Sequence, residues 1–278
     1  GNRCRTTGKS SFHTGSPIPN AAPVGFEMYL PFSLETFHLE YMRCLFHLRR
    51  PFTIALGFLG AGILPGSACS LALVVAMDGS SSVDAGEHKL QINGLARALQ
   101  DDDVVEAIQN VGGIWFSSFE WSGRYQQVVQ VNWRFLEDRE SIQETAEAIA
   151  ASGRGFDDFP TALGYALGYA AVHLKKVPEH CARNVIDVAG DGVNNEGFGP
   201  ASAYRAFGFE AITVNGLVIA GGEPDPVSYY RNKVIRGPGA FVEVADGYED
   251  YTAAMKRKLL REIGTGHYAK VGDQDQVR

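Results

Sequence analysis

The sequence predicts an α/β protein whose central sheet is doubly wound and mostly parallel, with helices on both faces. From residue 69 onward, apolar runs of strand length alternate with helical stretches. The first run, Leu71 to Met77, is apolar at every position, which is typical of a strand buried on both faces of a parallel sheet. With 278 residues, 45% of them hydrophobic, the chain is long enough for one such core.

The individual elements follow from local patterns. The predicted strands cover residues 71–77, 113–121, 126–133, 185–188, 211–220 and 240–244. The predicted helices cover residues 85–99, 101–108, 138–151, 161–174, 201–207 and 251–263. Asp101 and Asp138 stand where helix N-caps are favoured, and Ser122-Gly123-Arg124 is expected to join a pair of strands. Glycines and alanines in the helix predicted from Thr161 indicate close packing on the sheet.

Composition divides the chain into four segments. Residues 1–41 lack periodicity and begin rich in Gly, Ser, Thr and Pro, so we expect a disordered or upstream segment. Residues 42–68 have a basic stretch, an apolar stretch and small residues before Cys69, which is typical of a signal peptide. The folded domain is expected over residues 69–265, followed by a flexible tail over residues 266–278.

The expected signal peptide places the domain in the periplasm or outside a bacterial cell, with cleavage between Ala68 and Cys69. Its apolar stretch, residues 52–64, is shorter than the roughly 20 residues that span a bilayer, so no stable membrane insertion is expected after cleavage. Two alternatives stay open. One is a buried helix, and the other is a lipoprotein signal ending at Cys69, although Gly66 stands where such signals usually carry Leu.

The charge of the predicted domain argues against a nucleic-acid partner. From residue 69 onward the chain has 19 Lys and Arg against 29 Asp and Glu, a formal net charge of −10. Such a surface repels phosphate backbones, and no basic stripe interleaved with aromatic residues is visible. The four cysteines form no Cys-x-x-Cys pair, so zinc or thioredoxin-like chemistry has no support.

Oxygen-bearing side chains follow two predicted strands and open one predicted helix. Asp78, Ser80 and Ser82 follow the first strand, Thr161 opens a helix after a loop, and Asp191 follows the strand at 185–188. Ligands gather at the carboxyl ends of strands in open α/β sheets, so one ion would touch all three segments if the two strands are neighbours. Oxygen ligands suit a hard cation, which predicts Mg²⁺, with Mn²⁺ or Ca²⁺ as alternatives.

These segments resemble the von Willebrand factor A domain, whose metal-ion-dependent adhesion site (MIDAS) uses an Asp-x-Ser-x-Ser loop, a Thr and an Asp. The resembling stretches are 78–82, 161–167 and 186–192, although Pro160 replaces the glycine often seen before the threonine. The resemblance implies a doubly wound fold and a cation held directly by the hydroxyls and often through water by the carboxylates. It also implies a protein partner whose Asp or Glu completes the metal's shell.

More narrowly, the chain resembles a bacterial group of such domains with no assigned function, DUF1194. The stretches that carry this resemblance are Glu120-Trp121-Ser122-Gly123, residues 186–195 and residues 229–242. This resemblance implies an architecture rather than a biological role.

The rival class is a metal-dependent hydrolase that uses the same ion to activate water. It would need a general base, and none of His88, His173, His180 or His267 lies in the three loops. A Gly-x-Ser-x-Gly elbow is absent around Ser80 and Ser82. We therefore expect a binding module rather than an enzyme, and no catalytic residue is assigned.

Cys69 and Cys181 are predicted to form a disulfide. Cys69 precedes Asp78 by nine residues and Cys181 precedes Asp191 by ten, so both should lie at the end of the sheet opposite the proposed metal. Neighbouring parallel strands are about 4.8 Å apart, within the range that disulfides accept. Two free buried thiols would be favoured instead if the chain stays in the cytosol.

Overall fold

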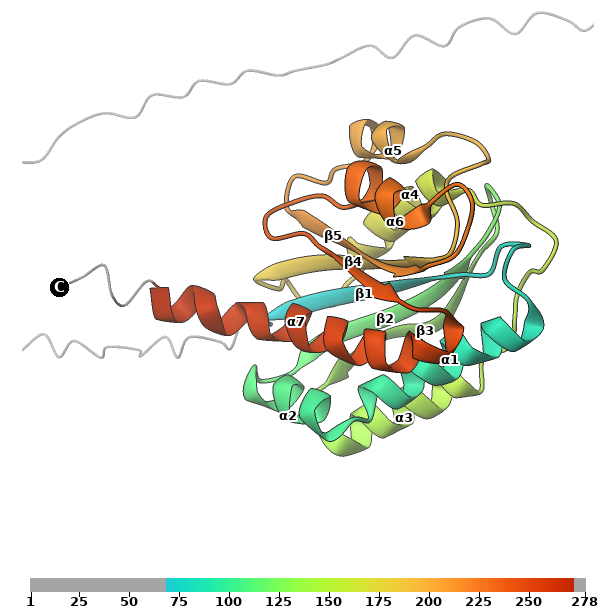
Figure 1. Ribbon diagram of the computed structural model, residues 1–278. Helices are drawn as coiled ribbons and strands as arrows, with labels where there is room; N and C mark the ends of the chain where they lie inside the picture. The colour runs from blue at the N-terminus through green and yellow to red at the C-terminus, as the bar shows by residue number, and fades with distance from the viewer. Residues whose placement is uncertain (1–68, 273–278) are drawn as a thin grey trace, which may run out of the picture. The chain divides into compact units, whose positions relative to one another are not determined.

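The computed structural model describes residues 69–272, with side chains up to residue 264 (Figure 1). The expected signal peptide and the segment before it therefore lie outside the described residues. A six-stranded sheet of order β3-β2-β1-β4-β5-β6 forms the centre of this part, and all neighbouring strands are parallel except β2 and β3. The strands are β1 (Leu71–Asp78), β2 (Ile114–Trp121), β3 (Gln127–Leu136), β4 (Arg183–Gly190), β5 (Ile212–Ile219) and β6 (Val242–Ala245). The predicted fold class is confirmed.

Helices cover both faces of this sheet (Figure 1). The helices are α1 (Ala85–Leu99), α2 (Asp102–Asn110), α3 (Arg139–Ala150), α4 (Leu163–Leu174), α5 (Pro200–Ala206), α6 (Pro226–Tyr229) and α7 (Tyr251–Gly272). Helices α1, α2, α3 and α7 pack on one face, and α4 and α5 pack on the other with the turn after α6. The arrangement is therefore a three-layer α/β/α domain.

Strand β1 is apolar from Leu71 to Met77 because both of its faces are buried. Side chains alternate across a strand, so the residues from Leu71 to Met77 at odd positions face the core under α1, α3 and α7. The residues from Ala72 to Ala76 at even positions face the core under α4 and α5. Every residue of β1 is buried, including Asp78 at its carboxyl end.

The chain path creates a switch point between β1 and β4. After β1 the chain builds β2 and β3 on one side, then crosses back to place β4 on the other side of β1. Loops leaving β1 and β4 at their carboxyl ends therefore diverge, which leaves an opening where ligands bind in such sheets.

Three details differ from the local patterns. The helix expected from Thr161 begins at Leu163, because the Thr161 carbonyl accepts from the N–H groups of Asn195 (3.0 Å) and Glu196 (3.2 Å) rather than from the next turn of the helix. A π-helical turn, Tyr230–Val234, follows α6, and apolar periodicity predicted neither element. Helix α7 runs to Gly272, into the segment expected to be a flexible tail.

A disulfide joins Cys69 to Cys181, with 4.3 Å between their Cα atoms. It lies just before the first residues of β1 and β4, where Leu71 pairs with Arg183. The Ala182 N–H donates to the Cys69 carbonyl at 2.8 Å, which holds the two strand entrances together. The structure thus contains the predicted pairing at the amino ends of the strands. Within the described residues no helix is long and apolar enough to cross a membrane.

Candidate metal centre

The loop after β1 turns back on itself through the carboxylate of Asp78. One oxygen, Oδ1, accepts a hydrogen bond from the Ser80 N–H at 2.8 Å. This contact directs the hydroxyls of Ser80 and Ser82 to the same side, with 3.2 Å between their oxygens. Asp78 and Ser80 are buried, whereas Ser82 is exposed. The loop therefore presents its oxygens at the edge between core and solvent.

The structure brings all five predicted site residues together. The Thr161 hydroxyl lies 3.4 Å from the Ser80 oxygen, and the Ser82 hydroxyl donates to Oδ1 of Asp191 at 2.8 Å. Thr161, Ser80, Ser82 and Asp191 therefore form a continuous chain of oxygen contacts across three loops. The predicted cysteines lie at the other end of the same two strands.

Asp78 is held in an unfavourable environment for its charge. Burial, and then the nearby carboxylate of Asp191, raise the pKa of Asp78 to about 7. Its second oxygen, Oδ2, is buried and has no hydrogen-bond partner among the described residues. Leaving a buried acceptor unpaired costs about 1–3 kcal/mol, more for a charged group. A positive charge placed here would offset that cost.

Glycine is required at position 190 beside this carboxylate. A Cβ atom added to Gly190 would lie 2.9 Å from Asp78 Oδ2 and 2.5 Å from the hydroxyl of Tyr230. The Tyr230 hydroxyl is also buried and without a partner in the described part of the chain. Two orphaned polar atoms thus face the same small space at the end of β4.

Arg154 fastens the loop that leads to Thr161 onto the loop after β1. Its Nη2 lies 3.2 Å from the Gly79 carbonyl oxygen, 3.1 Å from that of Ser80 and 2.7 Å from that of Val83. One guanidinium thereby contacts carbonyl groups of three residues in the loop after β1. The contact holds the segment that leads to Thr161 against the loop that carries Ser80 and Ser82.

Glu120, at the end of β2, also holds the loop that leads to Thr161. Its Oε1 accepts from the N–H groups of Gly155 (3.0 Å) and Phe156 (3.2 Å), and its Oε2 lies 2.8 Å from Nε2 of His88. Both Glu120 and His88 are buried. His88 is therefore engaged in a structural pair outside the three oxygen-bearing loops.

Asp191 is oriented by a tyrosine from the segment before α7. The Tyr248 hydroxyl donates to Oδ2 of Asp191 at 2.9 Å, while the Ser82 hydroxyl binds the other oxygen. Burial, together with the charge of Asp191, raises the pKa of Tyr248, so this hydroxyl stays a donor. A cavity of about 360 Å³ opens beside these residues and is also lined by Glu87 and Glu249.

The residues present fit a hard divalent cation. Two carboxylates and three hydroxyls supply only oxygen donors, the set that Mg²⁺, Mn²⁺ and Ca²⁺ prefer. Among the described residues no cluster of three or more His, Cys, Asp or Glu is placed to hold a metal.

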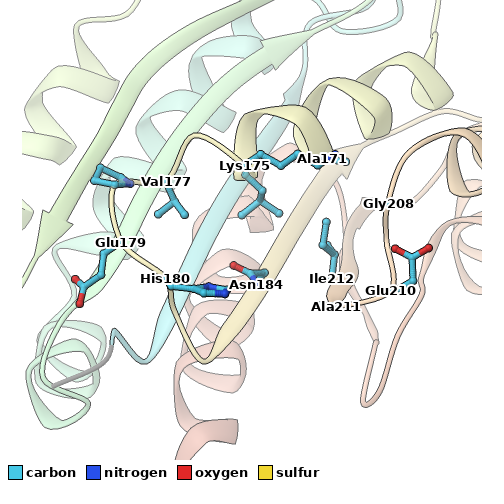
Figure 2. Close-up of a pocket in the computed structure, with 12 residues that line it drawn as sticks. Ala171, Lys175, Val177, Glu179, His180, Asn184, Gly208, Glu210, Ala211 and Ile212 are labelled. Atoms are coloured by element: carbon cyan, nitrogen blue, oxygen red, sulfur yellow. The ribbon is translucent and has the colours of Figure 1, made fainter. Parts of the chain in front are cut away.

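A second cavity, of about 630 Å³, lies away from these oxygens (Figure 2). Lys175, Val177 and His180 line it from the end of α4 and the loop that follows, and Asn184 and Ile212 line it from the starts of β4 and β5. The starts of parallel strands lie at the opposite edge of the sheet from their ends. This cavity is therefore separate from the candidate metal centre.

Solved structures share this fold at low sequence identity. Proximal thread matrix protein 1 (PTMP1) from the mussel byssus has a TM-score of 0.54 and 13% identity, over 69% of this chain and 48% of its own. A von Willebrand factor type A protein from Catenulispora acidiphila has a TM-score of 0.52 and 18% identity, over 71% of this chain and 43% of its own. The match thus spans less than half of each of these solved chains. A search of curated proteins found no match.

The sheet order and the two helical layers are those of the von Willebrand factor A fold. The chain belongs to the DUF1194 family, described as "Protein of unknown function", which matches residues 68–267.

Proposed function

We propose that this domain binds a divalent cation through Asp78, Ser80, Ser82, Thr161 and Asp191, and through that cation a carboxylate of a protein partner. The observation that carries the proposal is the buried, unpartnered Oδ2 of Asp78 beside a linked set of three hydroxyls and a second carboxylate. One PTMP1 structure is described as having a "zinc occupied MIDAS motif", which supports a cation at this place in the fold.

The donor set explains why a partner carboxylate would bind. We propose that the three neutral hydroxyls contact the cation directly and that the two carboxylates act through water, so a bound divalent cation keeps an attraction for a further anion. Ser82 is exposed and Asp191 is half-buried, so the centre is accessible to a partner from solvent. We propose Mg²⁺ as the resident cation, with Mn²⁺ or Ca²⁺ as substitutes.

We also propose that the domain works in the periplasm or outside the cell. The Cys69–Cys181 disulfide supports this, because disulfides persist in oxidising compartments and are rare in the cytosol. The expected signal peptide over residues 42–68 would supply the route of export.

Calorimetric titration with Mg²⁺ tests the cation site. Thr161→Val removes the hydroxyl while keeping the shape of the side chain, and Asp78→Asn removes the charge. Each change is expected to weaken Mg²⁺ binding at least about 100-fold, because even residues behind the ligands contribute 10–100-fold. Thr161→Ser, which retains the hydroxyl, is the matched control and should bind within a few-fold of wild type. Equal heats for all four proteins would show that the loops are turns without a metal.

Tyr248→Phe tests the group that orients Asp191. Loss of the 2.9 Å hydrogen bond should weaken Mg²⁺ binding by about 10-fold, since this contact fixes the carboxylate that the metal needs. Tyr169→Phe is a suitable control, because this half-buried tyrosine lies on α4 and stacks on His173. An unchanged dissociation constant for Tyr248→Phe would show that Asp191 is positioned without it.

A further inference from the structure

Aromatic side chains lie beside the candidate metal centre, and together they form what we call the aromatic rim: Tyr125, Phe159, Tyr165 and Phe198. Tyr125 is 80% exposed and Phe159 is 37% exposed. Both are large hydrophobic side chains that a domain with no partner would more often bury.

Each ring of the aromatic rim packs against another aromatic ring. Tyr165 stacks on Phe198 with 4.1 Å between ring centroids, and Tyr125 meets the edge of Tyr165 at 5.6 Å. Phe159 is packed in the same way against Phe156, at 5.5 Å. These contacts hold the exposed rings in place before anything binds, so a partner would not have to order them.

Backbone contacts tie the aromatic rim to the proposed metal ligands. The Phe159 carbonyl accepts from the Ser81 N–H at 2.8 Å, and Phe159 stands two residues before Thr161. Tyr165 stands four residues after Thr161, in the first turn of α4. A Cβ atom added to Gly123 would be 3.1 Å from Phe159 Cβ, so the turn that carries Tyr125 lies against the same loop.

The aromatic rim has charged neighbours of both signs. Arg124 and Glu196 form an ion pair at 3.0 Å, and Asp157 and Asp158 stand exposed just before Phe159. On the other side of the metal centre, the cavity beside Asp191 is lined by the carboxylates of Glu87 and Glu249. Of these two flanks in the described part of the chain, only the aromatic one carries large exposed hydrophobic side chains.

We propose that the aromatic rim binds a large apolar side chain of the protein partner, placed within a few residues of the carboxylate that meets the metal. This inference rests on the proposed function, because the carboxylate is the anchor that brings the apolar side chain to the rim. Aromatic residues dominate the energetic centres of protein interfaces, where they bury area at low entropic cost. The metal explains why the partner needs a carboxylate. The aromatic rim explains how the domain selects among partner segments that carry one.

A set of acetylated hexapeptides tests this proposal. Each peptide has one fixed Glu, and each other position carries Ala, Ser, Leu, Trp or Lys in turn. Binding to the full-length protein with Mg²⁺ is followed by fluorescence anisotropy, and each peptide is repeated with Gln for Glu and with chelator. At one or more positions, Trp or Leu is expected to tighten binding about 10-fold over Ala. Tyr125→Ser should remove this preference and retain the requirement for Glu and Mg²⁺.

Val172→Ser is the matched control, because Val172 is 41% exposed near the other end of α4, away from the rim. It should keep the preference for Trp and Leu. Binding that requires Glu and Mg²⁺ but treats Ala and Trp alike, or a preference that survives in Tyr125→Ser, would overturn the role of the aromatic rim alone. Tighter binding of Lys peptides would overturn it too and point to the acidic cavity. No requirement for Glu or Mg²⁺ in wild type would overturn the proposed function and this inference with it.

Discussion

Lys258→Ala is expected to lower the free energy of unfolding by about 3–5 kcal/mol, because it leaves two buried carboxylates without their shared ammonium group. Lys258 is fully buried on α7, and its Nζ lies 2.7 Å from Oδ1 of Asp187 on β4 and 2.5 Å from Oε1 of Glu262. Asn215 donates to the same Glu262 oxygen at 2.8 Å. Urea denaturation followed by circular dichroism measures the change.

Lys256 provides the matched control on the same helix. It also pairs with two carboxylates, Asp101 and Asp103, each at 2.8 Å, but its side chain is 32% exposed. Solvent screens such pairs, so Lys256→Ala should lower the free energy of unfolding far less than Lys258→Ala does. Equal losses for the two alanine variants would mean that the buried pair on α7 is no stronger than a surface pair.

The loss in Lys258→Ala should also depend on pH. Burial raises the pKa of Asp187 to about 7 despite the lowering effect of Lys258, so removing Lys258 raises the pKa further. A group whose folded-state pKa exceeds its unfolded value loses stability as pH rises toward the folded value. The variant should therefore fall further below wild type at pH 8 than at pH 5. A gap that is the same at both pH values would contradict this assignment.

The oxygen-bearing residues of the site could be predicted because each stands at a boundary that local sequence defines. Asp78 follows seven apolar residues, and Asp191 follows a short apolar strand ending in Gly190. Once β1 and β4 are neighbours, parallel pairing places both carboxylates at the same edge. The inference needed only the strand ends and the shared direction of the strands.

The supporting residues could not be predicted in this way. Tyr248 reaches Asp191 across 57 residues, and Arg154 reaches Gly79 across 75. Neither lies in a strand or at a position whose spacing points to the site. Such contacts depend on how loops fold over the sheet edge, which hydrophobic periodicity does not encode.

The burial of Lys258 agrees with the apolar periodicity of α7, although its charge argues against burial. Buried positions on α7 recur at helical spacing and include Tyr251, Met255, Leu259 and Ile263, and Lys258 lies on the same face. In the run Lys256-Arg257-Lys258 three cations suggest a solvated face, yet only the third is fully buried. Periodicity places Lys258 correctly, and Asp187 inside an apolar strand is its counterpart.

Loss of the Cys69–Cys181 disulfide is the second large effect that we expect. The bond closes a loop with a sequence separation of 112 residues. In the loop-entropy model, a loop of roughly this length contributes about 4–5 kcal/mol by restricting the unfolded chain. For a domain of this size, about 1 kcal/mol corresponds to about 2–4 °C in Tm, so Cys69→Ser/Cys181→Ser should melt about 8–20 °C below the oxidised protein. Thermal denaturation followed by circular dichroism measures the shift.

The two ends of β1 and β4 should respond separately to this change. The disulfide lies before Leu71 and Arg183, whereas the proposed metal ligands lie at and beyond Asp78 and Gly190, at the opposite edge of the sheet. At 20 °C the double serine variant should therefore stay folded and bind Mg²⁺ within about twofold of wild type, because distant sites contribute nearly additively. Adding reductant should lower the Tm of wild type and leave that of the variant unchanged. A Tm difference below about 3 °C would contradict the loop-entropy contribution, since it corresponds to about 1 kcal/mol. A large loss of Mg²⁺ affinity in the folded variant would instead show that β1 and β4 transmit changes from one edge to the other.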